Sequence, residues 1–100
     1  MKERFPGQFH KVTNNDLTAV GVLSNTVPLF VKVMYFKNVL RITTSNHLRT
    51  HLTFMNKEGN YIEVKPGDYI VQFDEPNASI EGSYAVISKE IMTYQFDISL

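Results

Sequence analysis

The sequence predicts an α+β fold, in which a bent and mostly antiparallel sheet of five or six strands carries two short helices. Short apolar runs, several with a period of two, alternate with clusters of turn residues, a pattern typical of antiparallel strands. Two stretches with helical spacing each follow residues that cap helices well. A length of 100 residues with 43% hydrophobic and 20% charged side chains indicates a single globular domain, residues 1–100. A small β-roll or barrel is the close variant of this fold.

The clearest local signal lies in residues 61–73, where Pro66-Gly67-Asp68 separates two apolar runs. Proline cannot donate to a sheet ladder and is therefore not expected in the middle of a strand. Gly67 can take the positive φ that a type II turn needs after proline. We therefore predict a hairpin, with two strands joined by this tight turn.

The strongest candidate for a single strand is Leu29 to Phe36, an apolar run interrupted only by Lys32. Its side chains would cover both faces, as in a central strand or in a strand covered by a partner. Lys37-Asn38 is a plausible hairpin turn after it, because asparagine tolerates positive φ. The other expected strands span residues 8–13, 39–44, 48–54 and 83–87.

Two helices are expected, near residues 15–24 and 88–96. Asn14-Asn15-Asp16 offers side-chain oxygens that accept from the free amides of a first turn, and Ser88 does the same for the second helix. Gly21 and several β-branched residues weaken the first helix.

The charge of the chain is zero overall but uneven along its length. Residues 1–57 carry eight basic and two acidic side chains, whereas residues 58–100 carry two basic and eight acidic side chains. If the halves formed separate faces, the molecule would be dipolar and would steer a charged partner. If strands of the two halves interleave, the charges pair across strands, and ordinary scatter of surface charge favours this interpretation.

Cysteine is absent, which excludes disulfides and thiolate metal sites. The chain opens without a basic segment followed by a long apolar one, and no apolar run is long enough to span a membrane. We expect a cytoplasmic protein with no membrane contact.

Catalytic and metal-binding motifs are not recognisable, so we expect a non-enzymatic protein without a cofactor. There is no nucleophile elbow, no glycine-rich phosphate loop and no evident carboxylate pair. His47 and His51 are four residues apart. On a strand, that spacing separates two side chains by about 13 Å, too far for one metal ion.

The apolar run at residues 29–36 predicts an interaction surface, because one face of a small sheet cannot hide all of it. A host protein or a second copy of the chain would use such a surface. Two covering helices would use it equally well.

A second hypothesis is a sponge that sequesters a small anionic, nucleotide-like ligand on basic and aromatic side chains. A nucleic-acid-binding module is a third, although the pI near 6.8 is below the usual basic range. The candidate binding residues for these functions are Lys32, Arg41, Arg49, Tyr35, Phe36, Tyr61 and Tyr69.

The order of motifs between residues 39 and 94 resembles a group of small, mostly uncharacterised proteins encoded by bacteriophages and prophages. The six-residue motif Pro66-Gly67-Asp68-Tyr-Ile-Val71 carries the resemblance, and a Gly82-led strand and a closing helix follow it. Those proteins often have a Tyr-Pro-Cys-Lys-Pro segment in the last loop, where this chain reads Tyr84-Ala-Val-Ile-Ser-Lys89. No ligand is therefore carried over.

The resemblance implies a setting rather than an activity: a bacteriophage accessory protein in the cytoplasm of the host cell. Together with the apolar run, it leads us to expect a protein that binds and inhibits or redirects a host factor, such as a defence protein, and that forms homo-oligomers.

Overall fold

The computed structural model describes residues 3–45, 47–74 and 84–98, and it has the α+β architecture that the sequence predicts. The elements follow one another as β1 (Gly7–Lys11), the 3₁₀ helix η1 (Asn14–Leu17), α1 (Ala19–Val22), α2 (Leu29–Phe36), β2 (Leu40–Thr44), β3 (Thr50–Met55), β4 (Tyr61–Val64), β5 (Tyr69–Phe73), β6 (Tyr84–Ile87) and α3 (Lys89–Gln95). The strands expected near residues 8–13, 39–44, 48–54 and 83–87 are confirmed to within a few residues, as far as the described residues extend.

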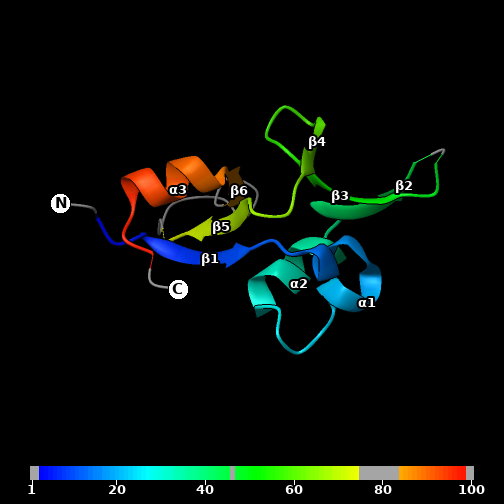
Figure 1. The fold of residues 1–100 in the computed structure, drawn as a ribbon, viewed down its shortest axis with the longest axis horizontal. Coiled ribbons are helices and arrows are strands. Elements are labelled where there is room, and N and C mark those ends of the chain that lie inside the picture. Colours follow the sequence, from blue (N-terminus) through cyan, green and yellow to red (C-terminus); the bar gives the residue numbers. More distant parts are fainter. Residues whose placement is uncertain (1–2, 46, 75–83, 99–100) are drawn as a thin grey trace.

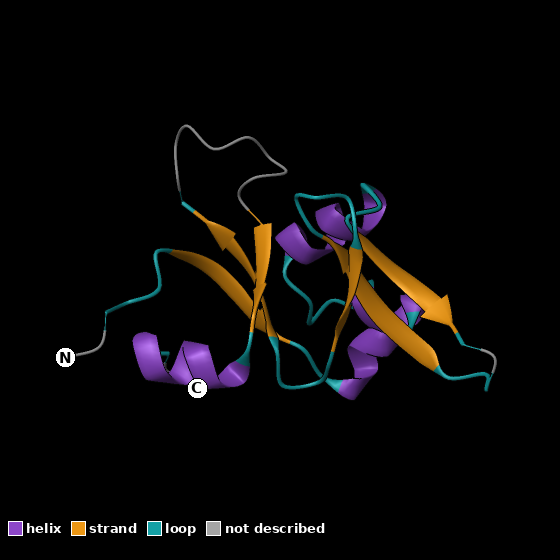
Figure 2. Ribbon diagram, turned by 90° about the horizontal axis from the view of Figure 1, so that it is seen from above, coloured by secondary structure: helices purple, strands orange, loops and turns teal. Residues whose placement is uncertain are grey.

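In the described part of the chain, six strands form two antiparallel sheets of three strands each, in the orders β1-β5-β6 and β2-β3-β4, which we call the β1 sheet and the β2 sheet. Figure 1 shows α3 beside the β1 sheet at one end of the molecule and α1 and α2 beneath the β2 sheet at the other. The two sheets are also well separated in the view from above (Figure 2). The prediction of one sheet of five or six strands is therefore wrong, and neither sheet closes into a barrel.

The turn at Pro66-Gly67 forms as predicted, but it does not close a hairpin. The φ of Gly67 is 99°, and the amide of Asp68 donates to the carbonyl of Lys65 across 3.0 Å, as a type II turn requires. β4 pairs with β3, whereas β5 pairs with β1 and β6. β4 and β5 take different partners because the turn is also bonded to the end of β1. The amide of Gly67 donates to the carbonyl of Val12, and the amide of Val12 donates to the carbonyl of Asp68. These bonds direct the chain onto β1, so the turn connects the two sheets.

The segment Leu29–Phe36 is a helix, α2, and the prediction of a central strand is wrong. A short continuous apolar run fits a buried strand and a helix equally well, and packing decides between them. As a helix it places Phe30, Val31 and Met34 on one buried face.

α2 ends in a Schellman motif rather than in the predicted hairpin turn. Asn38 has a φ of 62°, its amide donates to the carbonyl of Tyr35, and the amide of Val39 donates to that of Met34. The expected tolerance of Asn38 for positive φ is confirmed, in a different structural role.

The predicted helix 15–24 forms as two shorter pieces, η1 and α1, that meet at Thr18. This residue has extended backbone, and its side chain accepts from the amide of Gly21 and so caps α1. A Cβ atom at Gly21 would lie 1.5 Å from the carbonyl oxygen of Asn15, so only glycine allows the two pieces to pack this closely. The second predicted helix is confirmed as α3, and Ser88 caps it by accepting from the amide of Ile91.

The interior consists of two hydrophobic clusters that meet at β5. The larger cluster lies between the β2 sheet and its helices and extends to Val12, Ile70 and Tyr84 at the β1 sheet, and the smaller one lies between the β1 sheet and α3. Along β5, Ile70 belongs to the larger cluster, whereas its neighbours Tyr69 and Val71 belong to the smaller one. Among the residues that the structure describes, no helix is long and apolar enough to cross a membrane.

Candidate functional site

One face of α2 leaves large apolar side chains in solvent. Leu29 is 75% exposed and Phe36 is 70% exposed, and both lie opposite the buried residues of the helix. Lys32 and Val33 occupy the same face, since positions i, i+3, i+4 and i+7 coincide on a helix. We call Leu29, Lys32, Val33 and Phe36 the α2 face. It is apolar with one positive charge.

A second cluster lies on the outer face of the β2 sheet, at the end of α2. The guanidinium of Arg41 on β2 stands 5.4 Å from the ring centroid of Tyr61 on β4, a cation–π distance. The hydroxyl of Tyr61 donates to the carbonyl oxygen of Asn38 across 3.1 Å. The register explains this contact: Tyr61 is opposite Met55 and Arg41 is opposite Thr53, so both point to the same side across β3.

The two clusters meet at a shallow hollow of about 300 Å³, which is lined by Tyr35, Phe36, Asn38, Leu40, Arg41 and Ile42. The rings of Tyr35 and Phe36 lie 5.9 Å apart at 70°. Four of the seven predicted binding residues therefore come together, and we call Tyr35, Phe36, Arg41 and Tyr61 the aromatic–arginine surface. Lys32 lies beside it on the α2 face.

The remaining two predicted binding residues lie elsewhere. Arg49 precedes β3 at the far end of the β2–β3 hairpin, where it lines another hollow with Ser45, His47 and His51. Tyr69 is only 1% exposed and packs in the smaller hydrophobic cluster, so it is a core residue in this structure. Its place on β5 in the middle of the β1 sheet buries it, and the sequence alone does not show which strand takes that place.

His47 and His51, whose spacing on a strand is too wide for one metal ion, lie on different parts of the β2–β3 hairpin. His47 lies in the hairpin turn and His51 on β3, where the Nδ1 of His51 lies 3.2 Å from a carboxylate oxygen of Glu63 on β4. Within residues 3–45, 47–74 and 84–98, no three metal-ligating side chains gather.

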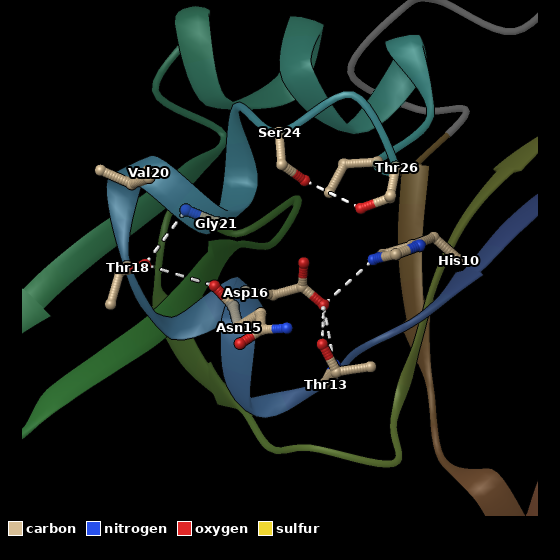
Figure 3. A pocket seen from close by; sticks show the side chains of 10 residues that line it. His10, Thr13, Asn15, Asp16, Thr18, Val20, Gly21, Ser24 and Thr26 are labelled. Carbon is tan, nitrogen blue, oxygen red and sulfur yellow. Dashed lines mark hydrogen bonds and ion pairs between the residues drawn. The ribbon is translucent and has the colours of Figure 1, made fainter.

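A polar pocket of about 620 Å³ lies between the end of β1, η1, α1 and the chain that leads to α2 (Figure 3). Asp16 of η1 forms its floor and is only 4% exposed. Its Oδ2 atom accepts from the Thr13 amide across 2.7 Å and from the Thr13 hydroxyl across 3.2 Å, and it lies 3.1 Å from Nε2 of His10. On the opposite wall, the hydroxyls of Ser24 and Thr26 are hydrogen-bonded to each other across 2.9 Å.

Asp16 stays ionised at neutral pH despite its burial. Burial raises the pKa of this carboxyl. The hydrogen bonds with His10 and Thr13 and the positive charge of protonated His10 together lower the pKa by more than burial raises it. The net result is a pKa below the ordinary value of 3.8. The pocket therefore has a fixed negative charge at its floor.

Sequence reasoning missed this pocket because it treated Asn14-Asn15-Asp16 only as a helix start. The spacing Thr13-x-x-Asp16 is that of a capping box, which is a local signal. His10 and the Ser24–Thr26 pair come close to Asp16 because β1 and the connection between α1 and α2 pack around η1. No pattern of adjacent residues in the sequence predicts this packing.

The chain matches no model of a known protein family, and searches of curated proteins and of solved structures find no significant match.

Proposed function

We propose that the protein is a non-enzymatic bacteriophage accessory protein that binds a host protein and inhibits or redirects it. The α2 face and the adjoining aromatic–arginine surface form the contact. The observation that carries this proposal is the exposure of Leu29 and Phe36 on one face of a helix, next to Arg41 and Tyr61. The phage setting rests on the resemblance of the Pro66–Val71 motif.

Exposed apolar side chains of this size support a binding role on energetic grounds. Covering a leucine or phenylalanine side chain completely contributes about 1.5–3 kcal/mol. Tyrosine and arginine are enriched among the residues that dominate binding energies, and here Tyr61 holds Arg41 in place by stacking. A partner that covers the hollow between Phe36 and Arg41 would gain from both groups.

The charge around this surface indicates an acidic partner. From residue 17 to residue 57 the chain contains no aspartate or glutamate, while Lys32, Lys37 and Arg41 lie on or beside the surface. Positive side chains around an apolar contact favour acidic residues around the matching contact of the partner. These rim charges will affect the rate of association more than the final affinity.

The test is capture from bacterial lysate with the immobilised protein, washed at low and at high salt, with mass spectrometry of the bound fraction. The informative variant is Phe36→Glu, and the matched control is Tyr94→Glu. Tyr94 lies on α3, is 81% exposed and is also an aromatic residue near the end of a short helix. Neither change touches the core, and circular dichroism verifies the fold of both.

We expect one stoichiometric protein to survive the high-salt wash on the wild type and on Tyr94→Glu, and to be lost from Phe36→Glu. Equal capture by all three proteins would overturn the proposed surface. A second copy of the chain is the other occupant of this surface, and mass measurement in solution over a range of concentrations detects it.

A second candidate function is favoured by the hollow between Tyr35, Phe36 and Arg41, which has the elements of an anion site with stacking rings. In that case the protein sequesters a small nucleotide-like anion. Thermal stabilisation by a nucleotide panel, lost in Arg41→Glu and retained in Arg49→Glu, would support it, because Arg49 lies in a different hollow. Binding of long nucleic acid instead would fall steeply with salt.

A further inference from the structure

The second carboxylate oxygen of Asp16 faces the pocket of Figure 3, which the proposed function does not use. The hydrogen bonds of this carboxylate with His10 and Thr13 all go to Oδ2. Within the described part of the chain no hydrogen bond reaches Oδ1, and this oxygen is not sealed from solvent. Figure 3 shows it pointing into the space in front of Ser24 and Thr26. A side chain that is 4% exposed thus directs an open acceptor into a pocket.

The groups around this oxygen define what the pocket can hold. Among the described residues that line it, Asp16 is the only carboxylate and there is no lysine or arginine, while His10, 3.1 Å from Oδ2, adds a positive charge only when it is protonated. The Ser24–Thr26 pair uses one hydroxyl proton in its own bond, which leaves one hydroxyl proton and several lone pairs for a ligand. The site therefore offers an anionic acceptor at the floor and a mixed donor–acceptor pair on the wall.

We propose that this pocket binds a small organic ammonium ion, whose N–H groups donate to Asp16 Oδ1 and to the hydroxyls of Ser24 and Thr26. A primary ammonium presents three donors, and the pocket lining offers three oxygen acceptors in Asp16 Oδ1 and the hydroxyls of Ser24 and Thr26. The volume of about 620 Å³ lies in the range of small-molecule sites. The valine side chains of Val20 and Val27 in the lining accommodate a short aliphatic stem.

The rigidity of the floor supports this assignment. Asp16 is held by the amide and the hydroxyl of Thr13 and by the ring of His10, so Oδ1 is oriented before a ligand arrives. Gly21, packed against the carbonyl of Asn15, fixes the opposite side of the pocket. A preoriented acceptor loses little entropy on binding, which favours a small ligand with few contacts.

The test is titration of the full chain with putrescine and with ethanolamine, followed by amide chemical shifts in NMR. The neutral control is 1,4-butanediol, the control for a cation without N–H donors is tetramethylammonium, and calcium chloride tests for an inorganic cation. We expect saturable shifts at Asn15, Gly21 and Ser24 with the two amines, and none with the three controls.

Two variants connect the shifts to the site. Asp16→Asn should raise the Kd for putrescine roughly tenfold or more, as for the loss of a charge-assisted hydrogen bond. Ser24→Ala, which removes a half-buried hydroxyl and does not touch the cap, should raise it about threefold, and Ser45→Ala on the distant hairpin should leave it unchanged. If Asp16→Asn does not fold, the Kd of Ser24→Ala for putrescine tests the proposal instead.

The inference is overturned if butanediol or calcium produces the same shifts, if the amines produce none, or if Ser24→Ala binds putrescine as the wild type does. These outcomes do not depend on capture of a host protein, because Leu29, Phe36 and Arg41 do not line the pocket.

Discussion

The two ends of the molecule bury their aromatic residues in different surroundings. At the β1 sheet the rings close the core: Phe5 lies 5.8 Å from Phe9, 5.3 Å from Phe73 and 5.0 Å from Phe96, between ring centroids. At the β2 sheet Phe30 and Phe54 are buried among aliphatic and methionine side chains, whereas Phe36 and Tyr61 remain at the surface. A chain of this size needs aromatic burial for stability, so rings left outside a core that is already filled are available for a partner.

The largest change in the free energy of unfolding is expected for core variants, which test whether the two ends unfold as one unit. Leu52 and Met92 are fully buried, one in each cluster. Leu52→Ala and Met92→Ala should each lower the free energy of unfolding by about 2–5 kcal/mol, the cost of a buried cavity. Because β5 contributes to both clusters, both variants should still unfold in one urea transition, with the same midpoint by circular dichroism and by tyrosine fluorescence. Two separate midpoints would show that the ends are independent.

A smaller effect is expected at the packing of η1 on α1, which occurs only at the β2 end. Gly21→Ala should destabilise the fold by roughly 1–3 kcal/mol, because its Cβ atom would overlap the carbonyl of Asn15. Gly59→Ala is the matched control, since nothing lies within 4 Å of its Cβ position and only its positive φ opposes the change. Denaturant unfolding of both variants measures the difference, and an equal loss in both would contradict the close packing at Gly21.

The pH dependence of stability tests the link between the two ends at His10 and Asp16. The pKa of Asp16 is lower in the folded chain than its ordinary value of 3.8. Its ionised form therefore stabilises the fold above pH 3.8, and this contribution disappears as the pH falls through the lower, folded value. Asp16→Asn should be less stable than the wild type at neutral pH, and the two should converge in acid. Urea midpoints over this range provide the measurement, and a constant difference would refute the lowered pKa.

The smallest effect is expected at the surface of the β2 end. Tyr61→Phe removes the hydrogen bond to the carbonyl of Asn38 and should cost about 0.5–1.5 kcal/mol. Tyr94→Phe is the matched change at the β1 end, where the structure gives the exposed ring no hydrogen bond among the described residues. Thermal unfolding compares the two. A loss confined to Tyr61→Phe would show that Tyr61 is anchored on the β2 sheet.

Turns and helix caps were predictable from the sequence, whereas the pairing of the strands was not. Gly67 takes the positive φ of its turn, and Ser88 caps α3, because both depend on a few adjacent residues. The partners of β4 and β5 depend on Val12, more than fifty positions away in the sequence, whose hydrogen bonds hold the turn. The charged halves interleave for the same reason, since β1 pairs with β5 and β4 with β3.

The candidate site shows the same limit. Four of the seven candidate binding residues, Arg41, Tyr61, Tyr35 and Phe36, lie together in the structure, although the helical state of α2 was predicted wrongly. Tyr69 has the same chemistry and is buried, because exposure depends on the position of a strand in its sheet. Side-chain type alone therefore identifies candidates, and only topology selects among them.

The connection at Lys65–Asp68 also determines how the chain can be divided. A cut in this turn would leave β1 on the first fragment, while its partner β5 and the next strand of the same sheet, β6, would lie on the second. Each fragment would then expose an unpaired strand edge that fits only the other. This arrangement suits a split reporter, in which two inactive pieces reassemble by strand complementation.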